Sequence, residues 1–186
     1  MKKILICLIA FSSTIFLQSQ NCNIKFGIKG GVNISTLKSN DEAFSWRPFF
    51  YFGVLSNKRV SNKISLQAEL NYSRQGAKSN IRTAYIFPVI DPVINYLTLP
   101  ILLQYTPYKG FLLNTGPQLG LLINQGSDKA FTKLDLAWTF GMGYKFNCGF
   151  GIDARYSLGI SQASNLSADI FTRVLQSGIF YRFDKK

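Results

Sequence analysis

Seven charged side chains alternate with large apolar residues and share the polar face of their segments. They are Lys25, Lys29, Glu69, Asp135, Asp153, Arg155 and Arg182. Successive side chains of a strand point to opposite faces, so this spacing turns all seven toward one side of a sheet. A charge buried in a narrow interior must be paired. We expect Glu69 and Asp153 to pair with Arg155 or the lysines as a salt-bridged plug; a polar conduit is the alternative.

The residue types that most catalytic sites need are missing. The chain has no histidine, which removes imidazole as a general base or metal ligand. It contains no Gly-x-Ser-x-Gly nucleophile motif. A dinucleotide-like pattern runs from Gly149 through Gly151 to Ala154, but it lies inside an alternating segment, whereas that motif must open a helix. We therefore expect no enzyme activity, no cofactor and no metal.

Two-residue alternation of apolar and polar side chains recurs along the chain and predicts β-strands. The clearest segment is 135–146, where large residues from Leu136 to Phe146 oppose small or polar ones. Seven further segments follow the pattern, and those at 46–56 and 95–106 are less regular. The eight expected strands are 25–35, 46–56, 65–73, 95–106, 111–121, 135–146, 151–158 and 175–183.

The connections between these segments alternate in length. Short ones are expected at 57–63, 107–110 and 147–148, and long ones at 38–45, 79–92, 123–134 and 161–168. Short periplasmic turns and long outer loops are typical of outer-membrane barrels, whose strands need roughly 9–11 residues to cross when tilted.

The composition of the two faces indicates which one meets the interior. Gly, Ser, Asn and Gln dominate the polar face and suit a narrow eight-stranded lumen. Aromatic residues near strand ends, such as Tyr144, Phe146, Tyr181 and Phe183, suit a girdle at the membrane interface. The sequence therefore predicts an all-β, eight-stranded, antiparallel up-and-down transmembrane β-barrel. A soluble lipocalin-like barrel around an apolar ligand is the main structural rival.

The first 19 residues have the order of a secretory signal peptide. Lys2 and Lys3 precede a mostly apolar stretch at 4–17, and small polar residues follow. That stretch is shorter than the roughly 20 residues a membrane-spanning helix needs. Cleavage after Ser19 is expected, with the barrel domain at 20–186; an uncleaved anchor is the alternative.

The end of the last segment looks like the signal that the outer-membrane barrel assembly machinery reads during insertion. That signal is a polar residue, a glycine and two aromatic residues at fixed spacing. Gln176, Gly178, Tyr181 and Phe183 fit its four positions, although three more residues follow.

The formal net charge is +12, yet the basic residues scatter, with no run longer than two. This pattern favours contact with outer-membrane lipid and anionic lipopolysaccharide over nucleic acid. The long connections at 79–92 and 123–134 are expected to carry an interaction role. The segment at 81–92 is unusually apolar and includes Tyr85, Ile86 and Phe87. These residues are expected to dock a protein partner or to fold over the barrel mouth.

Two cysteines remain after removal of the signal peptide, Cys22 and Cys148. The first strand and the turn that holds Cys148 are not expected to be neighbours. Two free thiols are therefore expected, with a disulfide as the alternative.

Four motifs give the chain a family resemblance. They cover 26–33, 67–76, 95–100 and 153–159, so the resemblance spans nearly all of 24–183. In their order and spacing the chain resembles the Bacteroidetes outer-membrane β-barrel domain family, often described as PorT-like. The resemblance implies an outer-membrane location and eight strands, but no single activity. A structural or loop-mediated interaction role is expected, with transport or service as a secretion-system accessory as the alternative.

Overall fold

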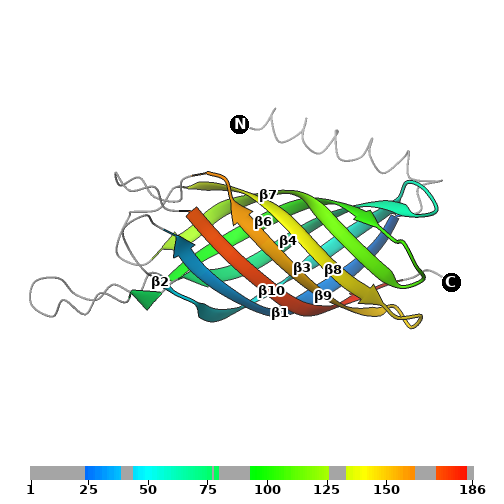
Figure 1. Ribbon diagram of the computed structural model, residues 1–186, viewed down its shortest axis with the longest axis horizontal. Coiled ribbons are helices and arrows are strands. Elements are labelled where there is room, and N and C mark those ends of the chain that lie inside the picture. Colours follow the sequence, from blue (N-terminus) through cyan, green and yellow to red (C-terminus); the bar gives the residue numbers. More distant parts are fainter. Residues whose placement is uncertain are drawn as a thin grey trace, which may run out of the picture.

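Eight long strands form a closed barrel in the computed structural model, which describes residues 24–38, 44–76, 78–79, 93–125, 133–161 and 171–183 (Figure 1). The strands are β1 (Ile24–Lys38), β3 (Arg47–Arg59), β4 (Ile64–Gly76), β6 (Val93–Tyr105), β7 (Phe111–Gln125), β8 (Leu134–Lys145), β9 (Phe150–Gly159) and β10 (Phe171–Arg182). Each expected segment corresponds to one of these strands, and most strands are longer than expected.

The barrel closes by pairing its first strand with its last. The order around the wall is β1-β10-β9-β8-β7-β6-β4-β3, and every neighbouring pair is antiparallel. Gly31 on β1 lies opposite Gly178 on β10 at the closing seam. Two short strands, β2 (Phe44–Ser45) and β5 (Lys78–Ser79), pair outside the barrel wall. Sequence alternation did not predict this pair, because two residues are too few to show a period.

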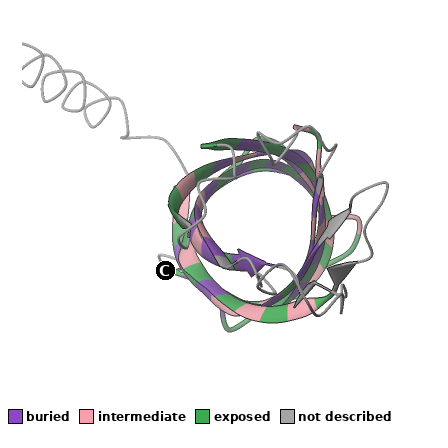
Figure 2. Ribbon diagram, turned by 90° about the vertical axis from the view of Figure 1, so that its left-hand side faces the viewer, coloured by how far each residue is buried: buried purple, intermediate pink, exposed green. Residues whose placement is uncertain are grey.

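The two faces of the wall differ as the alternation predicts. Buried and exposed residues alternate along each strand (Figure 2). Outward side chains such as Phe26 and Ile179 are 62% and 61% exposed, whereas inward Asn33 and Thr139 are fully buried. A soluble barrel would hide its large apolar groups inside. The lipocalin-like alternative is therefore wrong, and the fold is that of a membrane barrel.

The two less regular segments, 46–56 and 95–106, correspond to β3 and β6, and the structure explains why apolar and polar residues alternate weakly in them. Both strands carry apolar residues on the inner face as well as the outer one. Tyr51 and Leu55 on β3, and Tyr96 and Leu102 on β6, are buried in the lumen. Because apolar residues lie on both faces of these two strands, the alternation of apolar and polar residues in the sequence is weaker there.

The short connections lie together at one end of the barrel, at the right of Figure 1. We call this the short-turn end, and the opposite one the long-loop end. Gly110 and Gly149 have φ of 86° and 90° in two of these turns, a conformation that favours glycine. Gly149 thus belongs to a turn, and strand β9 follows it, so the dinucleotide-like pattern lacks its helix.

Several expectations lie outside the described residues. These are the signal peptide at 1–19, Cys22 and the loop residues Tyr85, Ile86 and Phe87. Cys148 is a free and exposed thiol. Within the described part of the chain, no helix is long and apolar enough to cross a membrane.

Candidate functional site in the barrel lumen

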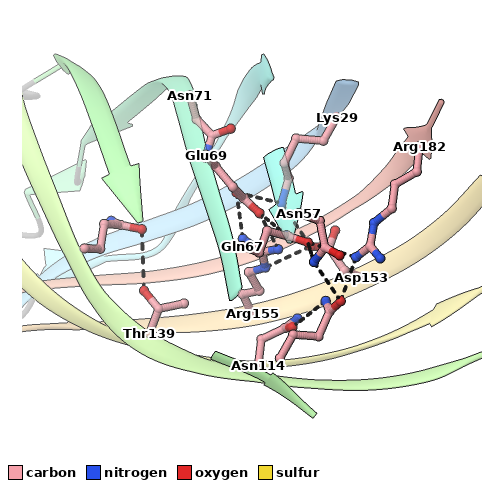
Figure 3. A network of polar contacts seen from close by, with 12 residues as sticks. Lys29, Asn57, Gln67, Glu69, Asn71, Asn114, Thr139, Asp153, Arg155 and Arg182 are labelled. Atoms are coloured by element: carbon pink, nitrogen blue, oxygen red, sulfur yellow. Dashed lines mark hydrogen bonds and ion pairs between the residues drawn. The ribbon is translucent and has the colours of Figure 1, made fainter. Parts of the chain in front are cut away.

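Four of the seven predicted charges meet near the middle of the lumen (Figure 3). Lys29 comes from β1, Glu69 from β4, and Asp153 and Arg155 from β9. Their side chains are at most 3% exposed. Two cations balance two carboxylates, so the group is formally neutral. We call these four residues the central ion cluster.

Glu69 is the best satisfied member of the cluster. Arg155 donates from Nη1 to Oε2 at 2.8 Å and from Nη2 to Oε1 at 2.7 Å, a two-pronged geometry that is both strong and directional. Gln67 and Asn71 also donate to the carboxylate. The ammonium of Lys29 lies 3.3 Å from Oε2.

Asp153 completes the cluster from the opposite wall. Its Oδ2 accepts a hydrogen bond from Lys29 Nζ at 2.9 Å and lies 2.8 Å from Arg155 Nε. That Nε–H does not meet hydrogen-bond geometry, so the second contact is an ion pair only. The other oxygen, Oδ1, has no hydrogen-bond partner in the described structure.

A glycine on the neighbouring strand makes room for the arginine. Gly141 on β8 is paired with Arg155 on β9. A Cβ atom at Gly141 would lie 2.6 Å from Arg155 Cγ. The absence of a side chain at 141 therefore lets the guanidinium cross the lumen toward Glu69.

Arg182 belongs to a second polar group, closer to the short-turn end. Its Nη2 donates to Oε1 of Gln67 and to Oε1 of Gln104, at 2.8 Å each. Gln104 in turn donates to Asn114 at 2.8 Å, and Asn57 donates to both glutamines. Side-chain amides, which a pattern of charges does not reveal, thus supply the acceptors for a buried guanidinium. Alternation had placed Gln67 and Asn114 on the inner face, but nothing in their type indicated a partner.

Asp135 forms a third group at the long-loop end. Its two oxygens accept hydrogen bonds from Ser161 and Thr172, at 3.0 Å each. Lys25 lies half-buried near the start of β1, at the opposite end. The seven charged residues therefore lie on the lumen side of the wall, as the alternation of side chains along the strands predicts. They form separate groups at different heights along the barrel and not one network.

Tyr51 is a large buried side chain in the lumen that the pattern of charged residues does not indicate. It is 2% exposed, its ring lies 5.3 Å from Lys29 Nζ, and its hydroxyl has no hydrogen-bond partner in the described structure. A Cβ at Gly178 would collide with that hydroxyl and with the carbonyl of Gly30. The glycine at 178 therefore gives the tyrosine the space it occupies.

The four residues of the expected assembly signal lie on the last strand and just past it. Gln176 and Gly178 face the lumen, whereas Tyr181 and Phe183 face outward. The Tyr181 ring packs between Phe150 and Phe183, with centroids 4.7 and 5.2 Å away. Tyr144 and Phe146 form a separate ring contact near the same end of the barrel, with centroids 5.1 Å apart.

The chemistry open to this lumen is limited. Among the described residues, no group of three or more potential ligands could hold a metal ion. The carboxylates of Glu69 and Asp153 are committed to cations. What the arrangement does is fill and cross-link the barrel.

The fold and its inverted faces define a transmembrane β-barrel. The model of the outer membrane protein beta-barrel domain matches residues 16–165. The chain belongs to this family, and it is an integral outer-membrane protein. No curated protein matches the sequence.

Solved outer-membrane barrels share the fold at low sequence identity. Neisserial surface protein A has a TM-score of 0.60 and 17% identity, over 85% of this chain and 97% of that one. The Yersinia pestis attachment invasion locus protein Ail, in complex with the heparin analogue sucrose octasulfate, has a TM-score of 0.52 and 18% identity, over 86% and 99%. Ail in a phospholipid bilayer nanodisc gives the same TM-score, at 16% identity.

Proposed function

We propose that this protein is a closed scaffold in the outer membrane that presents its long loops to partners and neither conducts solutes nor catalyses a reaction. The central ion cluster carries this proposal. Its side chains are at most 3% exposed, so water scarcely reaches the lumen at their level. An eight-stranded barrel leaves room for little besides its own side chains.

Conductance across a planar lipid bilayer tests the closed lumen. We expect the purified full-length protein to show no discrete current steps, because the ion cluster occupies the pore axis. The folded state of the inserted protein is checked by its gel mobility, which should differ between boiled and unboiled samples. Steady, reproducible steps from the folded protein would overturn the scaffold proposal in favour of transport.

The interaction role is assigned to the long connections, above all to Tyr85, Ile86 and Phe87. An apolar segment outside a membrane barrel needs cover, and a protein partner provides it. The Ail complex supports the idea that a barrel of this fold holds a ligand. A photo-cross-linker at Tyr85 should give a defined adduct in cells, and one at Lys109 in a short turn serves as control. Equal adducts at both positions would contradict a loop-specific role.

Export and insertion complete the proposal. A cleaved signal peptide at 1–19 and a domain at 20–186 fit the basic and apolar order of the first residues. The assembly machinery would read Gln176, Gly178, Tyr181 and Phe183. Lipopolysaccharide contact is supported by Arg74, which is exposed near the long-loop end of β4.

We also assign the chain to the PorT-like branch, with a secretion-accessory role as the second candidate. One observation favours this assignment: three of the four resembling motifs contain the whole central ion cluster. Lys29 lies in 26–33, Glu69 in 67–76, and Asp153 and Arg155 in 153–159. Co-purification of a secretion complex with the detergent-extracted protein tests the role, and its absence removes this candidate.

The orientation of the barrel gives a direct labelling prediction. Cys148 is exposed in the β8–β9 turn, and short turns face the periplasm in bacterial outer-membrane barrels. A large polyethylene-glycol maleimide should modify Cys148 only after the outer membrane is permeabilised. A Lys133→Cys variant should react in intact cells, because residue 133 is exposed near the long-loop end. Cys148→Ser separates the signal from any at Cys22, and the reverse pattern would invert the topology.

A further inference from the structure

The outer face of the barrel has an apolar groove near the short-turn end. It has a volume of about 490 Å³ and crosses β1, β3, β4 and β6. Small side chains form the floor of this groove, because Ser56 on β3 is paired with Ala68 on β4. Larger side chains flank that pair, since Phe26 is opposite Ser56 and Ile101 is opposite Ala68. The groove is therefore a local thinning of an otherwise bulky lipid-facing surface.

A basic group lies at the short-turn end of this groove. Lys58 follows Ser56 by two positions, so both side chains are on the outer face, roughly 7 Å apart along the strand. Arg59 and Lys63 are exposed beside it, at the two ends of the same turn. Within the described structure none of the three has an ion-pair partner.

Among the described residues, no exposed carboxylate lies at this end of the barrel. The described carboxylates, Glu69, Asp135 and Asp153, are all buried in the lumen. In the sequence, the three short connections contain no acid and two of them contain basic residues, whereas the segments that join the strands at the long-loop end contain five acids. Those five are Asp41, Glu42, Asp91, Asp128 and Asp169. The described surface around Lys58 is thus positive on the side of the barrel where the groove ends; the ninth acid, Asp184, lies outside the described residues.

We propose that this groove and its basic group form a binding site for an anionic phospholipid of the periplasmic leaflet. One acyl chain lies in the groove over Ser56 and Ala68, and the headgroup phosphate meets Lys58, Arg59 and Lys63. The occupant is a lipid because the groove is apolar, lies on the membrane-facing surface and continues directly into the cations. Free phosphate or an acidic peptide would use the cations but not the groove. The proposal rests on the short-turn end facing the periplasm.

Native mass spectrometry of the folded full-length protein tests the site. Phosphatidylglycerol and phosphatidylcholine with identical acyl chains are added at equal concentration in detergent. A surface-proximal basic residue contributes about 1 kcal/mol of attraction to an anionic lipid, which is about fivefold in affinity. We expect phosphatidylglycerol to bind at least fivefold more tightly. Lys58→Gln should remove about fivefold of that affinity and leave phosphatidylcholine binding unchanged, and Lys58→Arg should restore it.

Matched variants separate this site from diffuse attraction. Ala68→Phe fills the groove and should weaken both lipids, whereas Ala154→Phe makes the same change on the outer face of β9 and should not weaken phosphatidylglycerol binding. Lys109→Gln removes a charge from another turn and should have a smaller effect than Lys58→Gln. Equal binding of the two lipids, equal effects at 58 and 109, or no effect of Ala68→Phe would each overturn the proposal. Bilayer conductance does not depend on these outcomes, so the scaffold proposal is tested separately.

Discussion

Replacing Arg155 with methionine is expected to lower the free energy of unfolding by about 3–5 kcal/mol, because it leaves buried carboxylates without their main cation. Glu69 would lose both hydrogen bonds of the guanidinium and retain only Lys29 and two amides. Urea unfolding in lipid vesicles, followed by the fluorescence of outward-facing Trp138, measures the loss. The fraction with folded gel mobility provides an independent readout.

A second variant distinguishes ion pairing from simple loss of packing. Adding Glu69→Gln to Arg155→Met removes the unpaired charge while keeping the side-chain volume. The remaining Lys29 and Asp153 still balance each other at 2.9 Å. We expect the double variant to recover at least half of the lost stability. The exposed Lys109→Met should stay within about 0.5 kcal/mol of the native protein. If Arg155→Met also stays within that range, the cluster does not stabilise the barrel.

Tyr51 gives the second large expected effect. Tyr51→Ala should cost about 3–5 kcal/mol, as truncations of large buried aromatic residues do, because the ring fills the space beside Gly178. Tyr51→Phe should change stability by less than about 1 kcal/mol, because the hydroxyl it removes has no hydrogen-bond partner. The same urea titration measures both variants. A Phe variant as unstable as the Ala variant would show that the hydroxyl, not the ring, is the stabilising group.

The fold was predictable because the strands of a membrane barrel alternate between lipid-facing apolar residues and lumen-facing polar residues, which gives the sequence a period of two. β8, β4 and β9 alternate cleanly, and their inner and outer faces could be assigned residue by residue. β3 and β6 were less distinct because Tyr51 and Tyr96 replace polar groups on the inner face. The β2–β5 pair could not be predicted, since it depends on where two long connections meet in space.

The alternation of side chains along each strand could predict which charged residues face the lumen, but it could not predict which of them are in contact. The alternation of side chains places both Asp135 and Arg182 on the inner face. Asp135, however, is the second residue of β8, whereas Arg182 is the last residue of β10. They therefore lie at opposite ends of the barrel. The contact between Arg155 and Glu69 also depends on the registers that bring β9 and β4 face to face across the lumen. That information is in strand pairing, not in residue spacing.

The central ion cluster also constrains the order in which the protein can fold. Lys29 and Asp153 are 124 residues apart, and Glu69 and Arg155 are 86 apart, on strands that are not neighbours in the wall. Asp153 and Arg155 are paired within β9, but the carboxylate that Arg155 contacts through two hydrogen bonds and the ammonium that donates to Asp153 come from distant strands. The complete cluster therefore forms only when β1 meets β10 and the wall curls around the axis. Until then, water must solvate the charges that still lack their partners from distant strands, so closure of the seam and exclusion of water from the lumen are one cooperative step.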